Sequence, residues 1–215
     1  MLGSTLGFLL PSPNPSELKV TVLDVGQGTA VVVQVESKIL VYDTGPQFTE
    51  SFDAGGAILA PYLFAQGISR IDTLVVSHND RDHAGGLAGF LEKIKLEKLL
   101  VGDETLRAQY GQAKSCHSHE PWQWGDVNFE FIPLTVTNRT ADNNKSCVLL
   151  IRWKEQAILL PGDIESRVEN QLLSAEKIPE ALTLLVAAHH GSRTSSSPRL
   201  VRHTRPTYVV YSAGY

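Results

Sequence analysis

The sequence has little of several features that mark common classes of protein. It holds only two cysteines among 215 residues and no CxxC pair, which excludes a zinc ribbon and leaves either two free thiols or one disulfide. The apolar run near the N-terminus is about eight residues long, far short of the roughly 20 that a membrane span needs. Heptads, low-complexity tracts and short repeats are also absent from the sequence. These absences point away from coiled coils and repeat proteins.

An excess of positive charge is also lacking. Lysine and arginine together number 19 against 23 acidic residues, and the formal net charge is −4. Nucleic-acid binders often carry a basic excess, so the bulk charge counts against a DNA substrate. Locally the balance differs, because no acid follows Glu180. The arginines beyond it predict a basic rim for a phosphate backbone, or else a solvated helix face. The residues of this rim are Arg193, Arg199, Arg202 and Arg205, extended by Lys145 and Arg139.

The composition predicts one globular domain. With 42% hydrophobic content the chain can bury one sizeable core, and no shift in composition marks a boundary between two domains. We assign residues 18–215 to this domain. Residues 1–17 are proline-rich and lack the basic start of a signal peptide, which predicts a linker or the remnant of a preceding membrane segment. A start-site remnant is the alternative interpretation.

Hydrophobic patterning predicts strands followed by helices in both halves of the chain. Alternating, valine-rich segments are typical of consecutive antiparallel strands, and apolar residues at helical spacing indicate helices. This order of strands followed by helices predicts an α/β (α+β) fold in which two sheets pack face to face with helices outside. In the first half, strands are expected at 18–25, 29–35, 38–45 and 71–78, and helices at 55–67 and 87–94. In the second half, strands are expected at 127–132, 146–153, 156–163, 182–192 and 207–213, and helices at 164–175 and 197–204.

Metal-competent side chains stand where the apolar strands end. Strand ends on one edge of a sheet can converge in space, and imidazole with carboxylate suits zinc, manganese or iron. Several carboxylates favour a paired site in which one aspartate bridges two ions. Taken singly, a histidine pair is more often a surface feature and "PGD" a turn before a helix. The residues are Asp43; His78, Asp80, Asp82 and His83; Asp163; and His189 and His190.

The stretch "SHNDRDHAGG" carries the strongest signal. Four potential ligands in one non-helical segment would repel and desolvate one another without a cation. The loop from residue 78 to residue 83 is therefore predicted to bind metal.

The pattern His78-x-Asp80-x-Asp82-His83 resembles the HxHxDH signature of the metallo-β-lactamase fold, with aspartate in place of the second histidine. Other segments are similar, in order and spacing, to the soluble C-terminal domain of the ComEC DNA-uptake channel family of bacterial competence proteins. The similar blocks run from residue 23 to residue 196 and read "LDVGQGTAVVV", "YDTG", "NNKSCVLL", "LLPGDIE" and "AAHHGSRTS".

This resemblance implies a four-layer αββα sandwich with its active site along one edge. It implies a metal-dependent nuclease that degrades one strand of incoming DNA while the other crosses the membrane. A covalently linked channel domain, embedded in the bacterial inner membrane, would be the partner. The domain itself would lie on the periplasmic face, where Cys116 and Cys147 could pair.

The same resemblance assigns roles by position. One or two divalent ions are implied, and the oxygen-rich ligands favour manganese, with zinc possible. His78 and Asp80 would hold one ion, Asp82 and His83 the second, and Asp163 would bridge them. Either His189 or His190 would complete the second site. Catalysis is assigned to Asp82, which would orient water, and to His190 and Ser192. Substrate contacts are assigned to Lys145, Ser146, Arg193, Thr194, Ser195 and Gly85, the last through backbone N–H groups.

The chain departs from the family pattern at three places. Ser146 stands where many relatives have a third-block histidine, and Thr29 stands where the family usually has an acid. The chain stops at "YSAGY", so the sandwich is expected to lack its C-terminal edge. Two other functions therefore stay open: a small-molecule metallo-hydrolase acting on a lactone or phosphoester, and a non-catalytic DNA-binding module.

Two further segments invite a functional interpretation. Trp122 and Trp124 could stack single-stranded bases, but packing in the core or a loop is the preferred interpretation. The segment 116–119 contains cysteine and two histidines, yet its spacing fits no strand end. We expect an ordinary exposed loop there.

Overall fold

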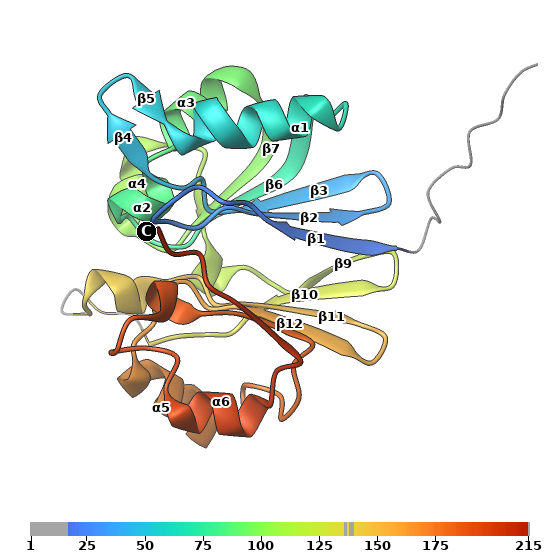
Figure 1. Cartoon of the computed structure of the whole chain (residues 1–215), viewed down its shortest axis with the longest axis vertical. Helices are drawn as coiled ribbons and strands as arrows, with labels where there is room; N and C mark the ends of the chain where they lie inside the picture. Colours follow the sequence, from blue (N-terminus) through green and yellow to red (C-terminus); the bar gives the residue numbers. More distant parts are fainter. Residues whose placement is uncertain (1–16, 136, 138–139, 215) are drawn as a thin grey trace, which may run out of the picture.

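The computed structural model describes residues 17–135, 137 and 140–214. Within these residues two six-stranded sheets pack face to face, with helices on both outer surfaces (Figure 1). This is the four-layer αββα sandwich that the motifs predict. Nearly all of the proposed N-terminal linker and Arg139 lie outside the described residues.

The first sheet has the strand order β1-β2-β3-β6-β7-β8. The first three strands are antiparallel neighbours, as their alternation predicts, and the last three join as parallel strands. Strands β7 and β8 were not predicted; β7 begins with Lys-Leu-Glu-Lys, which does not alternate strictly between polar and apolar residues. The strands are β1 (Leu18–Val22), β2 (Val31–Val35), β3 (Lys38–Tyr42), β6 (Arg70–Val76), β7 (Lys95–Val101) and β8 (Lys114–Ser115).

The second sheet has the order β14-β13-β12-β11-β10-β9. Strands β9 to β12 are antiparallel, and β13 and β14 join in parallel. The predicted strands are present here, but β9 was not expected. The strands are β9 (Trp122–Trp124), β10 (Val127–Phe131), β11 (Leu149–Trp153), β12 (Gln156–Leu160), β13 (Leu184–Val186) and β14 (Tyr208–Val210).

The helices form the outer layers. Above the first sheet lie a π-helical turn η1 (Gly55–Leu59), α1 (Ala60–Ala65) and α3 (Leu87–Lys93), and beneath the second lie α5 (Ser166–Ser174) and α6 (Pro198–Thr204) (Figure 1). Ser197 caps α6, because its hydroxyl accepts the backbone N–H of Leu200 at 3.2 Å. Within the described ranges, no helix is both long and apolar enough to cross a membrane. Shorter elements are a hairpin of β4 (Gln47–Thr49) and β5 (Phe52–Asp53), and the helical segments α2 (Arg81–Ala84), α4 (Glu104–Gln109), η2 (Cys116–Ser118), η3 (Asp142–Lys145) and η4 (Ala188–Gly191).

Buried side chains divide into a core for each interface between layers. The central core lies between the sheets and includes Tyr42 and Phe129, while two outer cores join each sheet to its helices. Trp122 stacks on Phe129 with ring centroids 5.0 Å apart, which agrees with packing rather than base stacking. The expectation of an exposed loop at 116–119 is wrong, because Cys116 is fully buried and disulfide-bonded to Cys147.

Candidate metal centre

Four strand ends converge on one edge of the sandwich. Strands β3 and β6 run in parallel in the first sheet, and β12 and β13 do so in the second. Their carboxyl ends therefore lie at the same edge of each sheet, where ligands bind in open α/β sheets. The residues that follow these strands are Asp43, the segment 78–83, Asp163 and the segment 188–191.

The ligand-rich segment is partly helical, which corrects the sequence-based expectation. Asp82 and His83 lie on α2, and Asp80 is the residue before its first turn. The fold brings α2 close to neighbouring backbone because two glycines follow it. A Cβ on Gly85 would lie 2.3 Å from the backbone nitrogen of Gln47, and one on Gly86 would lie 2.2 Å from the carbonyl oxygen of Thr44. Only glycine fits at these contacts.

His83 stands at the middle of the cluster and is fully buried. Its Nδ1 lies 2.7 Å from Oδ2 of Asp43, and its Nε2 lies 3.0 Å from Oδ1 of Asp163 and 3.1 Å from Nε2 of His190. Burial disfavours the charged imidazole, but the carboxylates of Asp43 and Asp163 outweigh burial and raise the pKa of His83 to about 10. The centre is thus built to hold positive charge.

Asp43 positions His83 rather than facing outward. Its carboxylate accepts the backbone N–H of Ser77 at 2.6 Å and the hydroxyl of Ser77 at 2.8 Å, while Oδ2 faces Nδ1 of His83. Asp43 has a φ of 59°, a left-handed conformation that aspartate tolerates better than most residues. A carboxylate on the far nitrogen of a ligating histidine is a common arrangement at metal sites. The strand-end pattern identified Asp43, but Ser77 gave no signal beyond preceding His78.

His78 provides the test of fit for a metal ion. Its Nδ1 contacts the Ser77 hydroxyl at 2.9 Å. Its Nε2 is buried and has no hydrogen-bond partner among the described residues, although it lies 3.4 Å from Oδ2 of Asp80 and 3.9 Å from Oδ2 of Asp163. A buried ring nitrogen facing two carboxylates without a hydrogen bond is suited to a cation between them. The residues present therefore fit a divalent ion.

The two neighbouring histidines differ in environment. Nε2 of His190 lies 3.1 Å from Oδ2 of Asp82, and Nδ1 lies 2.9 Å from the carbonyl oxygen of Ser212. The His189 side chain is 32% exposed, against 3% for His190, and its Nε2 lies 3.9 Å from Asp163. Both residues have left-handed backbone, with φ of 51° and 54°, a conformation that clusters at functional sites. His190 is the better-placed ligand.

The cluster contains two groups that could each hold an ion. One atom from each member of a group lies within 4.8 Å of the others. Among the carboxylates, burial raises the pKa of Asp82 and Asp163, but neighbouring histidines outweigh it and keep both pKa values below the ordinary range. Both aspartates are thus ionised near neutral pH. The groups are His78, His83 and Asp163, and Asp82, His83 and His190.

Two predicted substrate contacts are wrong. Ser146 is fully buried: its hydroxyl donates to the carbonyl oxygen of Asn143 at 2.6 Å and accepts the N–H of Asp163 at 3.0 Å. The N–H of Gly85 donates to Arg81 and that of Gly86 to Gly45, so neither is free for a phosphate.

The remaining predicted substrate residues occupy different surroundings. Arg193 and Thr194 are exposed in the turn after η4, and Ser192 is partly exposed there, whereas Ser195 is buried. Lys145 pairs with Asp103 at 3.2 Å. Arg199, Arg202 and Arg205 lie on or just after α6, in the outer layer (Figure 1). Arg199 donates to Asn170 and Ser174 on α5, and Arg205 lies 4.0 Å from Glu180.

Thr29, which stands where the family usually has an acidic residue, lies near the candidate centre but carries no charge. Its N–H donates to the carbonyl oxygen of Asp82 at 3.1 Å, and its hydroxyl lies 3.1 Å from that of Ser212. Ser212 in turn contacts His190 in η4. These contacts therefore link α2 to η4 through Thr29 and Ser212.

Comparisons with known proteins agree with this geometry. The family model described as the metallo-beta-lactamase superfamily matches residues 23–214. The chain is 36% identical over 200 residues to Competence protein ComA of Neisseria gonorrhoeae, and 35% identical over 199 residues to Recombination protein 2 of Haemophilus influenzae. These alignments cover 93% and 91% of this chain but 28% and 24% of the relatives. The chain thus spans about a quarter of their length, and the resemblance stated from the motifs is confirmed.

A solved structure shares the fold at lower identity. The chain superposes on CmlA, a diiron beta-hydroxylase from Streptomyces venezuelae, with a TM-score of 0.60 and 18% sequence identity. The alignment covers 93% of this chain and 45% of that chain. The likeness concerns the fold alone.

Proposed function

The chain belongs to the metallo-β-lactamase superfamily of metal-dependent hydrolases, and from that premise we propose that it is the nuclease domain of a DNA-uptake protein. The domain would cleave phosphodiester bonds in one strand of incoming DNA while the other strand crosses the membrane. The observation that carries the proposal is the cluster of imidazoles and carboxylates at the shared edge of the sheets. The 36% identity to a competence protein supports DNA as the substrate class.

Six side chains would hold two divalent ions. When bound, such ions supply charge neutralisation at a phosphate and lower the pKa of water. The carboxylate of Asp80 in place of a histidine makes the first site oxygen-rich, which favours manganese over zinc. His78 and Asp80 would serve the first ion, Asp82, His83 and His190 the second, and Asp163 both.

The chain's own groups would orient the reactants. Asp82 is ionised and its side chain is 30% exposed, so it can accept a hydrogen bond from a water molecule at the edge of the cluster. Asp43 holds His83 in orientation through Nδ1. Ser192, Arg193 and Thr194 lie in the turn next to His190, where a hydroxyl or guanidinium can bind a phosphate oxygen. The α6 arginines would add attraction at longer range.

The domain would be joined covalently to a membrane channel and lie on the periplasmic face of the bacterial inner membrane. One observation supports each of these two assignments. The named relatives are several times longer than the region that the chain matches, and Cys116 and Cys147 are disulfide-bonded, as is typical of oxidising compartments. Mass spectrometry of the protein isolated from the periplasmic side should find the cystine, and two free thiols there would contradict the location.

Cleavage of labelled DNA tests the proposed reaction. Metal-stripped protein is mixed with single-stranded or double-stranded DNA and one divalent ion at a time, and manganese should support faster cleavage than zinc. An Asp163→Asn variant purified in parallel controls for contaminating nucleases. If the protein binds DNA with strong salt dependence but cuts none with any ion, it is a binding module. If it leaves DNA intact but opens a lactone or small phosphoester, it is a small-molecule hydrolase.

A further inference from the structure

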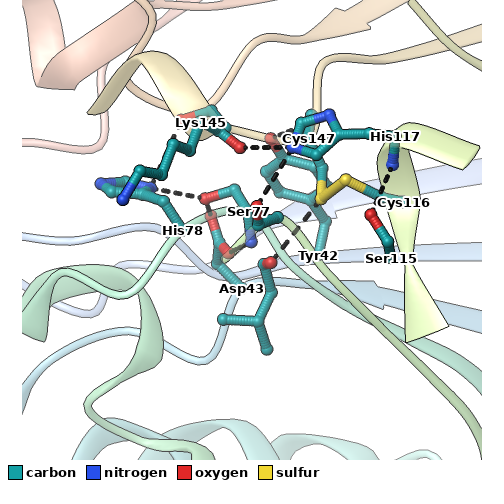
Figure 2. Close-up of a disulfide and its surroundings, with 12 residues drawn as sticks. Tyr42, Asp43, Ser77, His78, Ser115, Cys116, His117, Lys145 and Cys147 are labelled. Atoms are coloured by element: carbon teal, nitrogen blue, oxygen red, sulfur yellow. Dashed lines mark hydrogen bonds between the residues drawn. A yellow bond between two sulfur atoms is a disulfide. The ribbon is translucent and has the colours of Figure 1, made fainter. Parts of the chain in front are cut away.

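A disulfide joins the two halves of the molecule beside the metal centre. Cys116 lies in η2, directly after the last strand of the first sheet, and Cys147 lies two residues before β11 of the second sheet. Both residues are at most 1% exposed. Figure 2 shows Ser77 and Tyr42 next to the disulfide, with Asp43 and His78 beyond them.

The backbone of Cys147 is hydrogen-bonded to Ser77 and Tyr42, the residues directly before His78 and Asp43 in the first sheet's half of the molecule. Its N–H donates to the carbonyl oxygen of Ser77 at 3.0 Å, directly before His78. Its carbonyl oxygen accepts the hydroxyl of Tyr42 at 2.7 Å, directly before Asp43 (Figure 2). Tyr42 is itself 1% exposed, so its hydroxyl cannot readily hydrogen-bond to water in place of Cys147. The position of Cys147 is thus tied to the two strand ends that carry His78 and Asp43.

Ser146 extends this link to the second sheet. Its hydroxyl accepts the N–H of Asp163 at 3.0 Å, donates to Asn143, and lies 3.4 Å from Nδ1 of His78. A displacement of Cys147 would therefore move a residue that contacts ligands from both halves. The Ser146 hydroxyl donates its only proton to Asn143. Ser146 therefore serves as a spacer between Asp163 and His78.

A second set of contacts holds η2 against η3. Nε2 of His117 lies 3.1 Å from the carbonyl oxygen of Gly102 and 3.0 Å from that of Lys145. The Lys145 ammonium lies 3.2 Å from Oδ2 of Asp103. Gly102 and Asp103 follow β7 of the first sheet, and Lys145 belongs to η3, so these contacts cross between the halves at the same place as the disulfide. The disulfide is therefore one of several contacts that join the two halves at this place.

We propose that the Cys116–Cys147 disulfide is a positioning element of the metal centre. By holding Cys147 against Tyr42 and Ser77, it keeps Ser146 between Asp163 and His78 and so maintains their spacing. The proposal rests on the metal site proposed above, but it does not depend on DNA being the substrate. Groups that orient metal ligands typically contribute about 10- to 100-fold to metal affinity.

The first test removes the crosslink and measures manganese binding. The double variant Cys116→Ala, Cys147→Ala should keep the far-ultraviolet circular dichroism of the wild type but bind Mn²⁺ about tenfold more weakly by calorimetric titration. The control is Leu63→Ala, which removes buried volume from α1 in an outer core and so lowers stability away from the centre. Its manganese affinity should stay within about twofold of the wild type. Equal affinity in the double variant and the wild type, or equal losses in the double variant and control, would overturn the proposal.

A second test uses the unmutated chain, in case the double variant folds poorly. A water-soluble phosphine reduces the disulfide to two thiols, takes one oxygen from water to become its oxide, and is removed by desalting. Oxidised glutathione then accepts the two electrons and two protons of the thiols and restores the bond. Manganese affinity should fall on reduction and recover on reoxidation. Because both cysteines are buried, a thiol assay must show two free thiols after reduction. With that reduction shown, an affinity that stays constant through the cycle would contradict the proposal.

A third readout separates this proposal from the proposed function. In metal-free protein, the imidazole resonances of His78 and His83 should shift or broaden when the disulfide is absent but not in Leu63→Ala. If the wild type binds no manganese, the metal function fails, and the resonances still decide whether the disulfide positions the histidines. Unchanged resonances in the double variant would overturn the positioning role.

Discussion

The two halves of the sandwich contribute to the candidate metal centre in different ways. The first half places His78, Asp80, Asp82 and His83 within six consecutive positions, on one loop and a short helix. The second half supplies Asp163 and His190 from separate strand ends, and His190 reaches its place only through a left-handed turn. The first set is therefore organised locally, whereas the second depends on how the sheets dock. The complete centre is a property of the interface between the halves.

The largest effect should follow from removing the charge shared between them. Asp163 contacts His83 at 3.0 Å and lies within 4 Å of three further imidazole groups. Asp163→Asn keeps the shape but loses the charge, and it should reduce manganese-dependent DNA cleavage by at least about 10²-fold. Steady-state cleavage rates at saturating manganese measure this. Retention of more than a tenth of the wild-type rate would show that the charge of Asp163 is not needed for cleavage.

The histidine pair allows a sharper test of the second half. His190→Gln should lower manganese affinity and cleavage by about 10²-fold, because its ring contacts both Asp82 and His83. His189→Gln is the matched control, and it should lose less than about threefold, since its ring is more exposed and lies 3.9 Å from Asp163. Calorimetric titration and cleavage rates compare the two variants. A reversed order would assign the ligand to His189.

The local character of the first half explains why it was predictable. Alternation over 18–42 and the apolar run before His78 predict strands from sequence neighbours alone, and the dense ligand segment needs no knowledge of tertiary structure. The ligands of the second half could be identified only as residues at strand ends and by their resemblance to a family pattern. The choice between His189 and His190 depends on two positive φ angles, which composition cannot reveal.

What escaped prediction depends on contacts between distant residues. Gly85 was expected to offer its N–H to a phosphate, but that N–H donates to the carbonyl oxygen of Arg81, and the residue itself lies against the backbone of Gln47 in β4. The pairing of Cys116 with Cys147 was left open because cysteine spacing cannot decide it. Ser146 was assigned to substrate because it replaces a ligand, whereas its burial between Asn143 and Asp163 makes it structural.

Asp43 allows the local organisation of the first half to be broken without removing a proposed ligand. Asparagine also tolerates the left-handed φ of 59°, so Asp43→Asn isolates the carboxylate charge that faces His83. Manganese affinity should fall about tenfold, as for other groups that orient a ligating histidine. Calorimetric titration measures the change. An affinity equal to the wild type would show that the charge of Asp43 is not needed to orient His83.

The smallest predicted effect concerns an ion pair across the halves. The Lys145 ammonium lies 3.2 Å from Asp103, which follows β7, and 2.6 Å from Asp142 in η3. Lys145→Met keeps the aliphatic stem and should lower the free energy of unfolding by about 0.5–1 kcal/mol at pH 7. Arg107→Met is the control, because Arg107 pairs with Glu104 inside α4 and so within one half. Urea denaturation measures both variants.

The pH dependence of that difference identifies the ion pair as its cause. Burial raises the pKa of Asp103, but hydrogen bonds from Thr105 and the Lys145 ammonium outweigh it, so the pKa lies below the ordinary 3.8. Its stabilisation is therefore present above pH 3.8 and lost as pH falls through the lowered value. Asp142 and Asp103 raise the pKa of Lys145 above 10.5, so its stabilisation is present below that pH and lost as pH rises through the raised value. The difference between wild type and Lys145→Met should thus persist from about pH 4 to 10 and shrink on both sides. A difference that does not change with pH would mean that the charge of Lys145 is not the cause of the lost stability.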